Sequence, residues 1–547
     1  MIAAIFQAHG IEDVVICPGS RSAPLTLAFV RNAHFTCRSV IDERSAGYIA
    51  LGIAQQKNKP VILICTSGTA ALNLSPALAE ARYLGVPLIA LTADRPDAWI
   101  DQLDGQAIHQ QHIYDAFILR SWHISGELYH PDDLWYTQRV VNEAILDAKQ
   151  KKGPIHINLA FREPLYQLPN LNDYSLQVIQ SLHNQAEKSY SYPALVQQLR
   201  ETGKFWLVFA QDVYDATLAP MLQQGIDQLN WTIVHESLSN LHVFSSIRNI
   251  NEVLSLNKIP PSPPDTVIYF GKQLVSKKLK QYLRNLSHLQ VIQVGDHLAD
   301  PLQHLHAYIN APAHQVVKFL LESRATGNDV FNKQWIHASH RAAQWYAEFL
   351  THAAYSDFLA IAHIRKSFPE GTIVHWGNST PVRYAQLTEN LNLPFQVHYC
   401  NRGTSGIDGS ISTAVGHALA NPGRKQVVIV GDLSFQYDCN ALWINDFPDN
   451  LLVIVVNNRG GNIFRLIEGS SQVPELETWF ETRRTGHFQN LSAHFGLSYR
   501  QCTTQEELQV LCAELPQLSR CVVEVVTDPV LSSQVFKEFY QYLRQNT

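Results

Sequence analysis

The feature of this sequence that most constrains its fold is a unit that recurs along the chain. A short β-branched run is followed by a turn with glycine or a small polar residue, and then by a helical pattern; residues 13–30, 37–56 and 61–81 are examples. Continuous apolar strands that alternate with helices are typical of parallel sheets covered on both faces. The sequence therefore predicts an α/β protein.

Polar stretches divide these units into three blocks. Residues 182–193 and 322–333 have the composition of linkers. We therefore predict three doubly wound α/β domains with mainly parallel sheets, spanning residues 1–181, 194–320 and 336–547. In such sheets ligands bind at the carboxyl ends of the strands, so that is where functional residues are expected.

The composition excludes several classes of function. The 547 residues are 46% hydrophobic, and the net charge of −6 arises from basic and acidic residues scattered along the chain. This pattern predicts neither a nucleic-acid partner nor a membrane surface. No apolar run approaches the roughly 18 residues that span a bilayer, and residues 1–15 lack the basic region of a signal peptide. The eight cysteines form no CxxC pair. We expect a cytoplasmic protein with reduced cysteines that acts on small molecules.

An acid and a pair of amides follow two apolar strands of the third block. Asp432 comes directly after the strand in VVIVGDLSF, and Asn458 follows the strand in LLVIVVNNRGG. A carboxylate, an amide oxygen and a loop carbonyl such as that of Gly460 suit Mg²⁺, and would leave half of its octahedron to a ligand such as a diphosphate. The alternative interpretation is a helix cap and an ordinary turn.

The spacing of these residues resembles the diphosphate and magnesium motif of thiamin-diphosphate enzymes, with residues 433–456 between the two elements. Leu433 stands where many members have glycine. The resemblance implies the thiamin-diphosphate-binding fold, with thiamin diphosphate as cofactor and Mg²⁺, or alternatively Mn²⁺, held by Asp432, Asn458 and Gly460. It also implies that the cofactor contacts Glu43, Ile407, Gly431, Asp432, Leu433, Ser434, Asn458, Gly460, Ile463 and Phe464.

In that family a glutamate from another domain protonates the aminopyrimidine ring of the cofactor. Glu43 fits this role, because it ends a strand of the first block and precedes a helix of small residues suited to close packing against a sheet. The alternative interpretation is an acid that stabilises the first turn of a helix. The family arrangement pairs the first domain of one subunit with the third domain of another, which implies a homodimer or homotetramer.

Five stretches resemble one branch, the 2-succinyl-5-enolpyruvyl-6-hydroxy-3-cyclohexene-1-carboxylate (SEPHCHC) synthase family of menaquinone biosynthesis. They are CPGSRSAPL (17–25), TADRP (92–96), GNSTPVR (377–383), NRGTSGIDG (401–409) and NNRGGNIF (457–464). The resemblance implies a transferase that decarboxylates 2-oxoglutarate and adds the succinyl-semialdehyde carbanion to isochorismate by 1,4-addition. Menaquinone or phylloquinone is the expected end product.

Both substrates are dianions, which guanidinium groups bind well. Four arginines lie in predicted strand-end loops, where a lone arginine is more often solvated. The resemblance implies that Arg383, Arg402 and Ser379 hold the 2-oxoglutarate carboxylate, and that Arg21, Arg95 and Gln106 face isochorismate, with Lys277 a further substrate residue. It makes Glu43, Ser379, Arg383 and Arg402 the catalytic set. Gly105 and Lys278 depart from the family pattern, which commonly has Asn and Arg there.

Two other functions remain open from the sequence. The nearer is another thiamin-diphosphate 2-oxo acid decarboxylase or carboligase, such as an acetolactate synthase, although that branch usually binds FAD and no GxGxxG follows a middle-domain strand. The other is a protein that binds the cofactor without catalysis. Such a protein is expected to lose Glu43 or the metal ligands, and all are present here. Ile407, Ile463 and Phe464 also fit as ordinary core residues.

Overall fold

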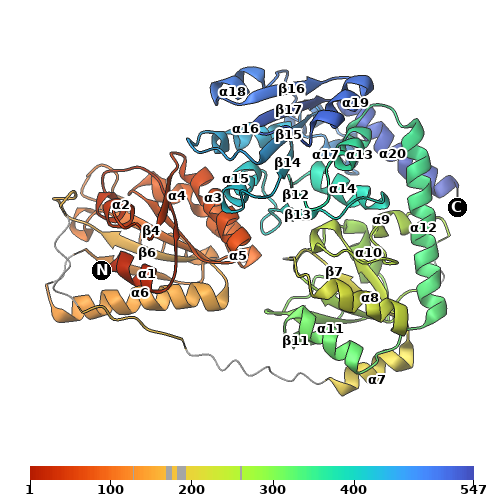
Figure 1. The fold of residues 1–547 in the computed structure, drawn as a ribbon, viewed down its shortest axis with the longest axis horizontal. Helices are drawn as coiled ribbons and strands as arrows, with labels where there is room; N and C mark the ends of the chain where they lie inside the picture. The colour runs from red at the N-terminus through yellow and green to blue at the C-terminus, as the bar shows by residue number, and fades with distance from the viewer. Residues whose placement is uncertain (127–128, 168–174, 182–191, 213, 259–261, 547) are drawn as a thin grey trace.

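Three parallel β-sheets organise the protein (Figure 1). The structure, a computed structural model, describes residues 1–126, 129–167, 175–181, 192–212, 214–258 and 262–546. Within these residues every paired strand in the three sheets is parallel. The predicted fold class is confirmed.

The first domain has a six-stranded sheet in the order β2-β1-β3-β4-β6-β5. Its strands are β1 (Asp13–Ile16), β2 (Thr36–Ser39), β3 (Val61–Cys65), β4 (Leu88–Asp94), β5 (Ser121–Ser125) and β6 (Ile155–Ala160). Its helices are α1 (Ile2–Ala8), α2 (Ala23–Val30), α3 (Glu43–Lys57), α4 (Thr69–Asn73), α5 (Ser75–Leu84) and α6 (Pro131–Lys151).

The second domain has a five-stranded sheet in the order β11-β10-β9-β7-β8. Its strands are β7 (Phe205–Phe209), β8 (Thr232–His235), β9 (Thr266–Phe270), β10 (Gln290–Gly295) and β11 (Leu305–Asn310). Its helices are α7 (Pro193–Thr202), α8 (Leu218–Leu229), α9 (Ile250–Val253), α10 (Lys277–Arg284) and α11 (Ala313–Glu322).

The third domain has a six-stranded sheet in the order β13-β12-β14-β15-β17-β16. Its strands are β12 (Ile373–Trp376), β13 (Val397–Cys400), β14 (Gln426–Gly431), β15 (Leu451–Asn457), β16 (Ser498–Cys502) and β17 (Cys521–Val526). The helices from this part of the chain are α12 (Asp329–His352), α13 (Asp357–Ser367), α14 (Thr380–Leu387), α15 (Ser410–Ala420), α16 (Asp432–Tyr437), α17 (Ile463–Leu466), α18 (Gln489–His494), α19 (Gln505–Glu514) and α20 (Pro529–Gln545).

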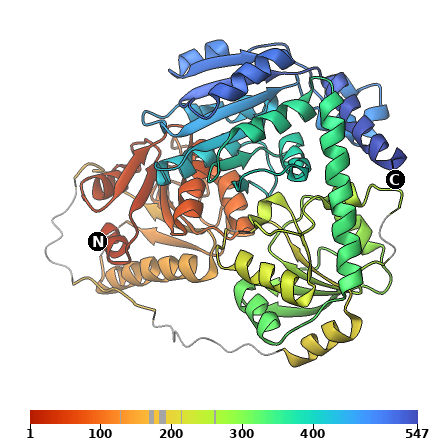
Figure 2. The same cartoon turned by 45° about the vertical axis from the view of Figure 1, so that its right-hand side comes forward.

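The linker predicted at 322–333 is wrong in its second half, because α12 begins at Asp329. The Asn328 side chain accepts a hydrogen bond from the Phe331 N–H at 2.9 Å and so caps this helix. Turn-forming residues at this point serve as a helix cap rather than as a flexible connection. α12 then runs along the outside of the second and third domains (Figures 1 and 2). Of the other predicted linker, residues 182–191 lie outside the described residues.

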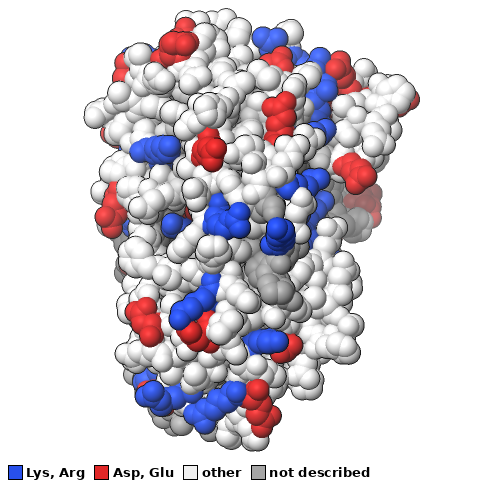
Figure 3. Space-filling model, turned by 90° about the vertical axis from the view of Figure 1, so that its right-hand side faces the viewer, with Lys and Arg blue, Asp and Glu red and all other residues white. Residues whose placement is uncertain are grey.

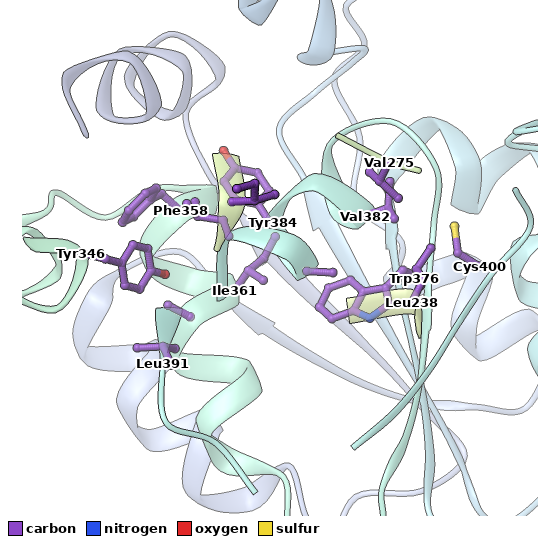
Figure 4. Packing of buried hydrophobic residues seen from close by; sticks show 14 of the residues in the cluster. Leu238, Val275, Tyr346, Phe358, Ile361, Trp376, Val382, Tyr384, Leu391 and Cys400 are labelled. Carbon is purple, nitrogen blue, oxygen red and sulfur yellow. The ribbon is translucent and has the colours of Figure 1, made fainter. Parts of the chain in front are cut away.

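The third domain shares a hydrophobic core with each of the other two, and alternate residues of β14 face the two cores. Val427 and Ile429 belong to a cluster that includes the second domain and α12, whereas Val428 and Val430 belong to a cluster shared with the first domain. Figure 4 shows part of the former cluster, in which Leu238 of the second domain lies among third-domain side chains. The third sheet therefore packs against the second domain on one face and against the first domain on the other.

The predicted helix of small residues is α3, and it packs against more than the expected sheet. It contacts β1 and β3, and its glycine face packs closely against α15 of the third domain. A Cβ at Gly52 would lie 2.1 Å from the Thr413 carbonyl oxygen, and one at Gly416 would lie 2.0 Å from that of Ile49. The first and third domains are therefore joined by a backbone-to-backbone helix contact.

Replacing Gly52 with alanine is expected to lower the free energy of unfolding by about 1–3 kcal/mol, the usual cost of overpacking. The added methyl group meets a backbone oxygen, which moves only if the two helices move apart. Urea denaturation measures the change. Gly423→Ala is the control, since nothing lies within 4 Å of a Cβ at that position. Equal stability of the two variants would contradict the close packing.

The surface carries charges of both signs. On the face formed largely by the second and third domains, Lys and Arg side chains alternate with Asp and Glu (Figure 3). All eight cysteines are free thiols, as predicted. In the part of the chain that the structure describes, no helix combines the length and the apolar character needed to cross a membrane.

Candidate active site

A cavity of about 440 Å³ lies at the carboxyl edge of the third sheet. β14 and β15 are adjacent and parallel, with Gly431 paired to Val456, so the residues that follow them meet at this edge. Asp432 begins α16 directly after β14, and Asn458 follows β15. Both side chains line the cavity.

Every site residue predicted in the third domain lines this cavity. They are Ser379, Arg383, Arg402, Ile407, Gly431, Asp432, Leu433, Ser434, Asn458, Gly460, Ile463 and Phe464. Six further lining residues were not predicted: Asn378, Thr380, Pro381, Ser405, Gly461 and Asn462. The short sequence motifs therefore converge in space, although residues 377–383 and 457–464 are far apart in the chain.

Asp432 is a buried acid whose surroundings favour a nearby cation. Its side chain is only 3% exposed. Burial raises the pKa of its carboxyl to about 7, although backbone N–H groups of Leu433 and Gly460 favour the ionised form. A cation beside this carboxylate would stabilise its charged form.

The amide of Asn458 presents a second oxygen to the same cavity. Its Oδ1 is buried and accepts no hydrogen bond from any described residue, while its Nδ2 donates to Asp357 Oδ2 at 2.8 Å. Gly460 has φ of +148°, and a Cβ there would lie 2.5 Å from the Glu481 carbonyl oxygen, so only glycine fits. A free amide oxygen beside a buried carboxylate fits Mg²⁺ or Mn²⁺, which prefer hard oxygen ligands.

Asn462 is a cavity residue that the sequence interpretation missed. Both its Nδ2 and its Oδ1 are buried and have no hydrogen-bond partner among the described residues. Buried amides usually have partners, so this side chain is suited to a polar ligand. The sequence feature that could have identified Asn462 is its position in RGGNIF, directly before two residues that were predicted to contact the cofactor.

Three apolar residues form the remaining wall. Ile407, Ile463 and Phe464 are partly exposed, line the cavity, and belong to none of the described core clusters. Ser434 Oγ donates to the Ile407 carbonyl oxygen at 2.8 Å and so ties the loop of Ile407 to α16. Their interpretation as ordinary core residues is wrong.

Two arginines lie at the other end of the cavity with no acidic partner. Arg402 follows β13 in a loop, as predicted, and its Nη1 donates to Asn378 Oδ1 at 2.9 Å. Arg383 was predicted in a loop, but it lies in α14, where its Nη1 donates to the Ser379 carbonyl oxygen. Burial and the charge of Arg402 lower the pKa of Arg383. Neither arginine forms an ion pair within the described residues, so the pair is suited to a carboxylate ligand.

Side chains of the first and second domains hold the loop that carries Arg402. Glu80 of α5 is fully buried and accepts from Gly403 N at 2.7 Å and from Thr404 N at 2.6 Å. Gln273 of the second domain donates to the Gly403 carbonyl oxygen at 3.0 Å. Glu80 was not singled out in the sequence, because a glutamate in an amphipathic helix resembles any surface acid.

The predicted residues Arg21, Glu43 and Arg95 follow strands of the first domain, at the carboxyl edge of its sheet. Glu43 is the first residue of α3 and raises the pKa of the Cys65 thiol, which burial already raises. Arg21 is 5% exposed and donates to the Phe161 carbonyl oxygen at 2.9 Å, while Arg95 donates to the Gly105 carbonyl oxygen at 2.9 Å. None of these residues lines the cavity of the third domain.

The remaining predicted substrate residues also lie outside the cavity. Gln106 is exposed and has φ of +60°, next to Gly68. Lys277 is the exposed first residue of α10. Lys278 turns inward, donates to Ser255 Oγ at 2.6 Å and lies 5.3 Å from the centroid of the Tyr540 ring. The cavity of one chain is therefore lined by the third domain alone among the described residues.

Comparison with known proteins agrees with this geometry. Residues 1–116 match "Thiamine pyrophosphate enzyme, N-terminal TPP binding domain", and residues 379–525 match "Thiamine pyrophosphate enzyme, C-terminal TPP binding domain". A 2-succinyl-5-enolpyruvyl-6-hydroxy-3-cyclohexene-1-carboxylate synthase of Cytophaga hutchinsonii is 38% identical over 99% of this chain and 98% of its own length. The chain belongs to the SEPHCHC synthase family.

Other relatives with the same name extend this finding. The Porphyromonas gingivalis protein is 34% identical over 98% of this chain and 96% of its own length, and the Bacteroides fragilis protein is 33% identical over 99% and 98%. The SEPHCHC synthase family resemblance predicted from the motifs is thus confirmed along nearly the whole chain. The two domain matches place the chain among the thiamin-diphosphate enzymes.

Proposed function

We propose that this SEPHCHC synthase family member decarboxylates 2-oxoglutarate and adds the succinyl-semialdehyde unit to isochorismate, as a transferase of menaquinone or phylloquinone biosynthesis. The observation that carries the proposal is the composition of one cavity. It combines Asp432 and the free Oδ1 of Asn458 with Arg383 and Arg402, which have no acidic partner among the described residues. A metal-binding half and a carboxylate-binding half therefore face the same space.

Thiamin diphosphate would supply the carbon nucleophile and the electron sink that decarboxylation of a 2-oxo acid requires. Asp432, Asn458 and Gly460 would hold the Mg²⁺ or Mn²⁺ ion, with Gly431, Leu433 and Ser434 beside the diphosphate. Ile407 would support the cofactor, while Ile463 and Phe464 would exclude water from the reacting centre.

The arginines would then select the substrate. Arg383 and Arg402 bind the distal carboxylate of 2-oxoglutarate, assisted by Ser379, and the loop contacts of Glu80 keep Arg402 in place. Arg21 and Arg95, with Gln106 and Lys277, bind the carboxylates and polar groups of isochorismate. Arg21 and Arg95 follow strands of the first sheet at the same edge as Glu43, which supports one shared surface for cofactor activation and second-substrate binding.

The absence of Glu43 from the cavity lining supports a homodimer, and a homotetramer would be built from such dimers. Neither Glu43 nor Arg95 lines the cavity of its own chain, and the lining comes from the third domain. We propose that Glu43 of the partner subunit closes each cavity. Each dimer would then contain two complete sites of equal composition.

Substrate choice tests the proposal against acetolactate synthase chemistry. Pyruvate lacks the distal carboxylate and would leave the partly buried cations Arg383 and Arg402 unpaired, which costs up to about 2–5 kcal/mol. We expect kcat/KM for pyruvate to lie at least ~30-fold below that for 2-oxoglutarate. Arg402→Ala should reduce this ratio. Decarboxylation of both acids, and a coupled assay with isochorismate, provide the measurements.

The control is Arg500→Ala, which removes an exposed arginine of β16 that does not line the cavity. This variant should keep the wild-type preference. A wild-type enzyme that uses pyruvate as well as 2-oxoglutarate would refute the proposed function. An Arg402→Ala variant with an undiminished preference would show instead that other residues select the substrate.

A further inference from the structure

The two asparagines at the end of β15 have different surroundings. Asn457 Nδ2 donates to Glu524 Oε1 at 2.6 Å, and Asn457 Oδ1 accepts from Arg459 N at 3.1 Å. Asn458 Nδ2 likewise donates to a buried carboxylate, Asp357 Oδ2, at 2.8 Å. Its Oδ1, however, is buried without a partner among the described residues and lines the cavity. Only the second amide has an oxygen free for a ligand.

Asp357 is itself held firmly. It is the first residue of α13 and its side chain is completely buried. Asp357 Oδ1 accepts from Thr527 Oγ1 at 2.5 Å and from Ser532 Oγ at 3.2 Å, and the Asp357 N–H donates to Ser532 Oγ at 3.1 Å. These partners follow β17 or belong to α20, so three segments of the third domain fix the position of this carboxylate.

The chemistry of the pair determines which way the Asn458 amide points. A carboxylate only accepts hydrogen bonds, whereas a carboxamide has a donor nitrogen at one end and an acceptor oxygen at the other. Contact with Asp357 therefore requires Nδ2 on that side and directs Oδ1 toward the cavity. In the opposite orientation two oxygens would face each other in a buried site, which is unfavourable.

We propose that Asp357 is a positioning residue that orients the Asn458 amide so that its oxygen faces the bound cation. This inference rests on the metal site in the proposed function. Asp357 does not line the cavity, and its direct contact with a proposed metal ligand is the hydrogen bond from Asn458. Hydrogen bonds that orient metal ligands typically change metal affinity about 10–100-fold. Asp357 also links the cation site to α13 and α20.

The test is the affinity for Mg²⁺, measured by calorimetric titration of Mg²⁺ into the protein with saturating thiamin diphosphate. Asp357→Ala and Asp357→Ser both remove the acceptor for Asn458 Nδ2, and the serine variant keeps a hydroxyl for Thr527 and Ser532. We expect the dissociation constant for Mg²⁺ to rise about 10–100-fold in each. Thermal melting of the cofactor-free protein identifies a variant that does not fold.

Asp357→Asn tests orientation against charge. An amide oxygen at position 357 can still accept from Asn458 Nδ2, because the hydroxyls of Thr527 and Ser532 can accept from the new amide nitrogen. This variant should retain more Mg²⁺ affinity than Asp357→Ser. A loss as large as in the serine variant would overturn the orienting role, because it would show that the negative charge alone matters.

Glu524→Gln is the matched control. It replaces the carboxylate that accepts a hydrogen bond from Asn457 and does not change the contact of Asn458. It should change thermal stability but not Mg²⁺ affinity. Unchanged affinity in a folded Asp357→Ser protein would overturn the inference. Asp432→Ala separates this outcome from failure of the proposed function. If Asp432→Ala also binds Mg²⁺ normally, the proposed metal site is wrong. If Asp432→Ala loses Mg²⁺ affinity, the metal site stands and only the proposed role of Asp357 is wrong.

Discussion

Replacing Glu43 with glutamine is expected to lower turnover by roughly 10²–10⁴-fold, the usual effect of removing a positioned proton-transfer group. Glutamine keeps the size and polarity of the side chain but cannot donate a carboxylic proton to the aminopyrimidine ring. Glu43 is only partly buried at the start of α3, and Asp42 caps that helix through Arg44 N and Ser45 N. Folding and cofactor binding should therefore survive the change.

The exchange rate of the C2 proton of bound thiamin diphosphate reports this step directly. It should fall together with turnover in Glu43→Gln. Glu12→Gln is the control, because Glu12 precedes β1 at the opposite edge of the same sheet. An exchange rate equal to that of the wild type would show that another residue activates the cofactor.

Replacing Asp432 with alanine is expected to abolish Mg²⁺-dependent binding of thiamin diphosphate. Asp432 is the only carboxylate among the described residues that line the cavity. Asn458 can offer only a neutral oxygen, which binds Mg²⁺ weakly on its own. Calorimetric titration of thiamin diphosphate with and without Mg²⁺ measures the loss.

The cofactor-free Asp432→Ala protein should not melt at a lower temperature than the wild type. Burial raises the pKa of Asp432 from 3.8 to about 7, so this group lowers the stability of the folded protein as the pH rises from about 4 through 7, and the full cost is present above pH 7. Removing the group takes away this unfavourable term. Asp449→Ala, at an exposed acid beside Arg520, is the control for general effects of charge. Unchanged cofactor affinity in Asp432→Ala would remove this residue from the metal site.

The strands that the sequence predicts best are those buried on both faces. β14 and β15 are continuous apolar runs because α-helical layers and neighbouring domains cover both sides of the third sheet. The edge strands β5, β11 and β16 were not predicted. Their sequences SWHIS, LHAYIN and SYRQC mix polar and apolar residues, since one side of each is exposed and no continuous apolar run results.

The residues after β14 and β15 were predicted to meet because adjacent parallel strands end at one edge, and local sequence contains that information. Asp432 and Asn458 are therefore found from spacing alone. Arg383 and Arg402 were predicted as site residues only from the resemblance to a known family. The prediction that Arg383 lies in a loop was wrong, because it lies in α14. A short helix that begins with Thr-Pro after a strand resembles a loop in the sequence.

The sequence by itself determined the α/β fold class, the family and the residues of the third-domain cavity, because these depend on periodicity and on motifs a few residues long. Only the tertiary structure decided that Glu43 and Arg95 do not line that cavity, and that Asp357 and Glu80 hold its loops. Those contacts join residues more than one hundred positions apart through hydrogen bonds of buried groups. Nothing in the local sequence distinguishes such an acid from one on the surface, since burial and partners arise only when the domains pack together.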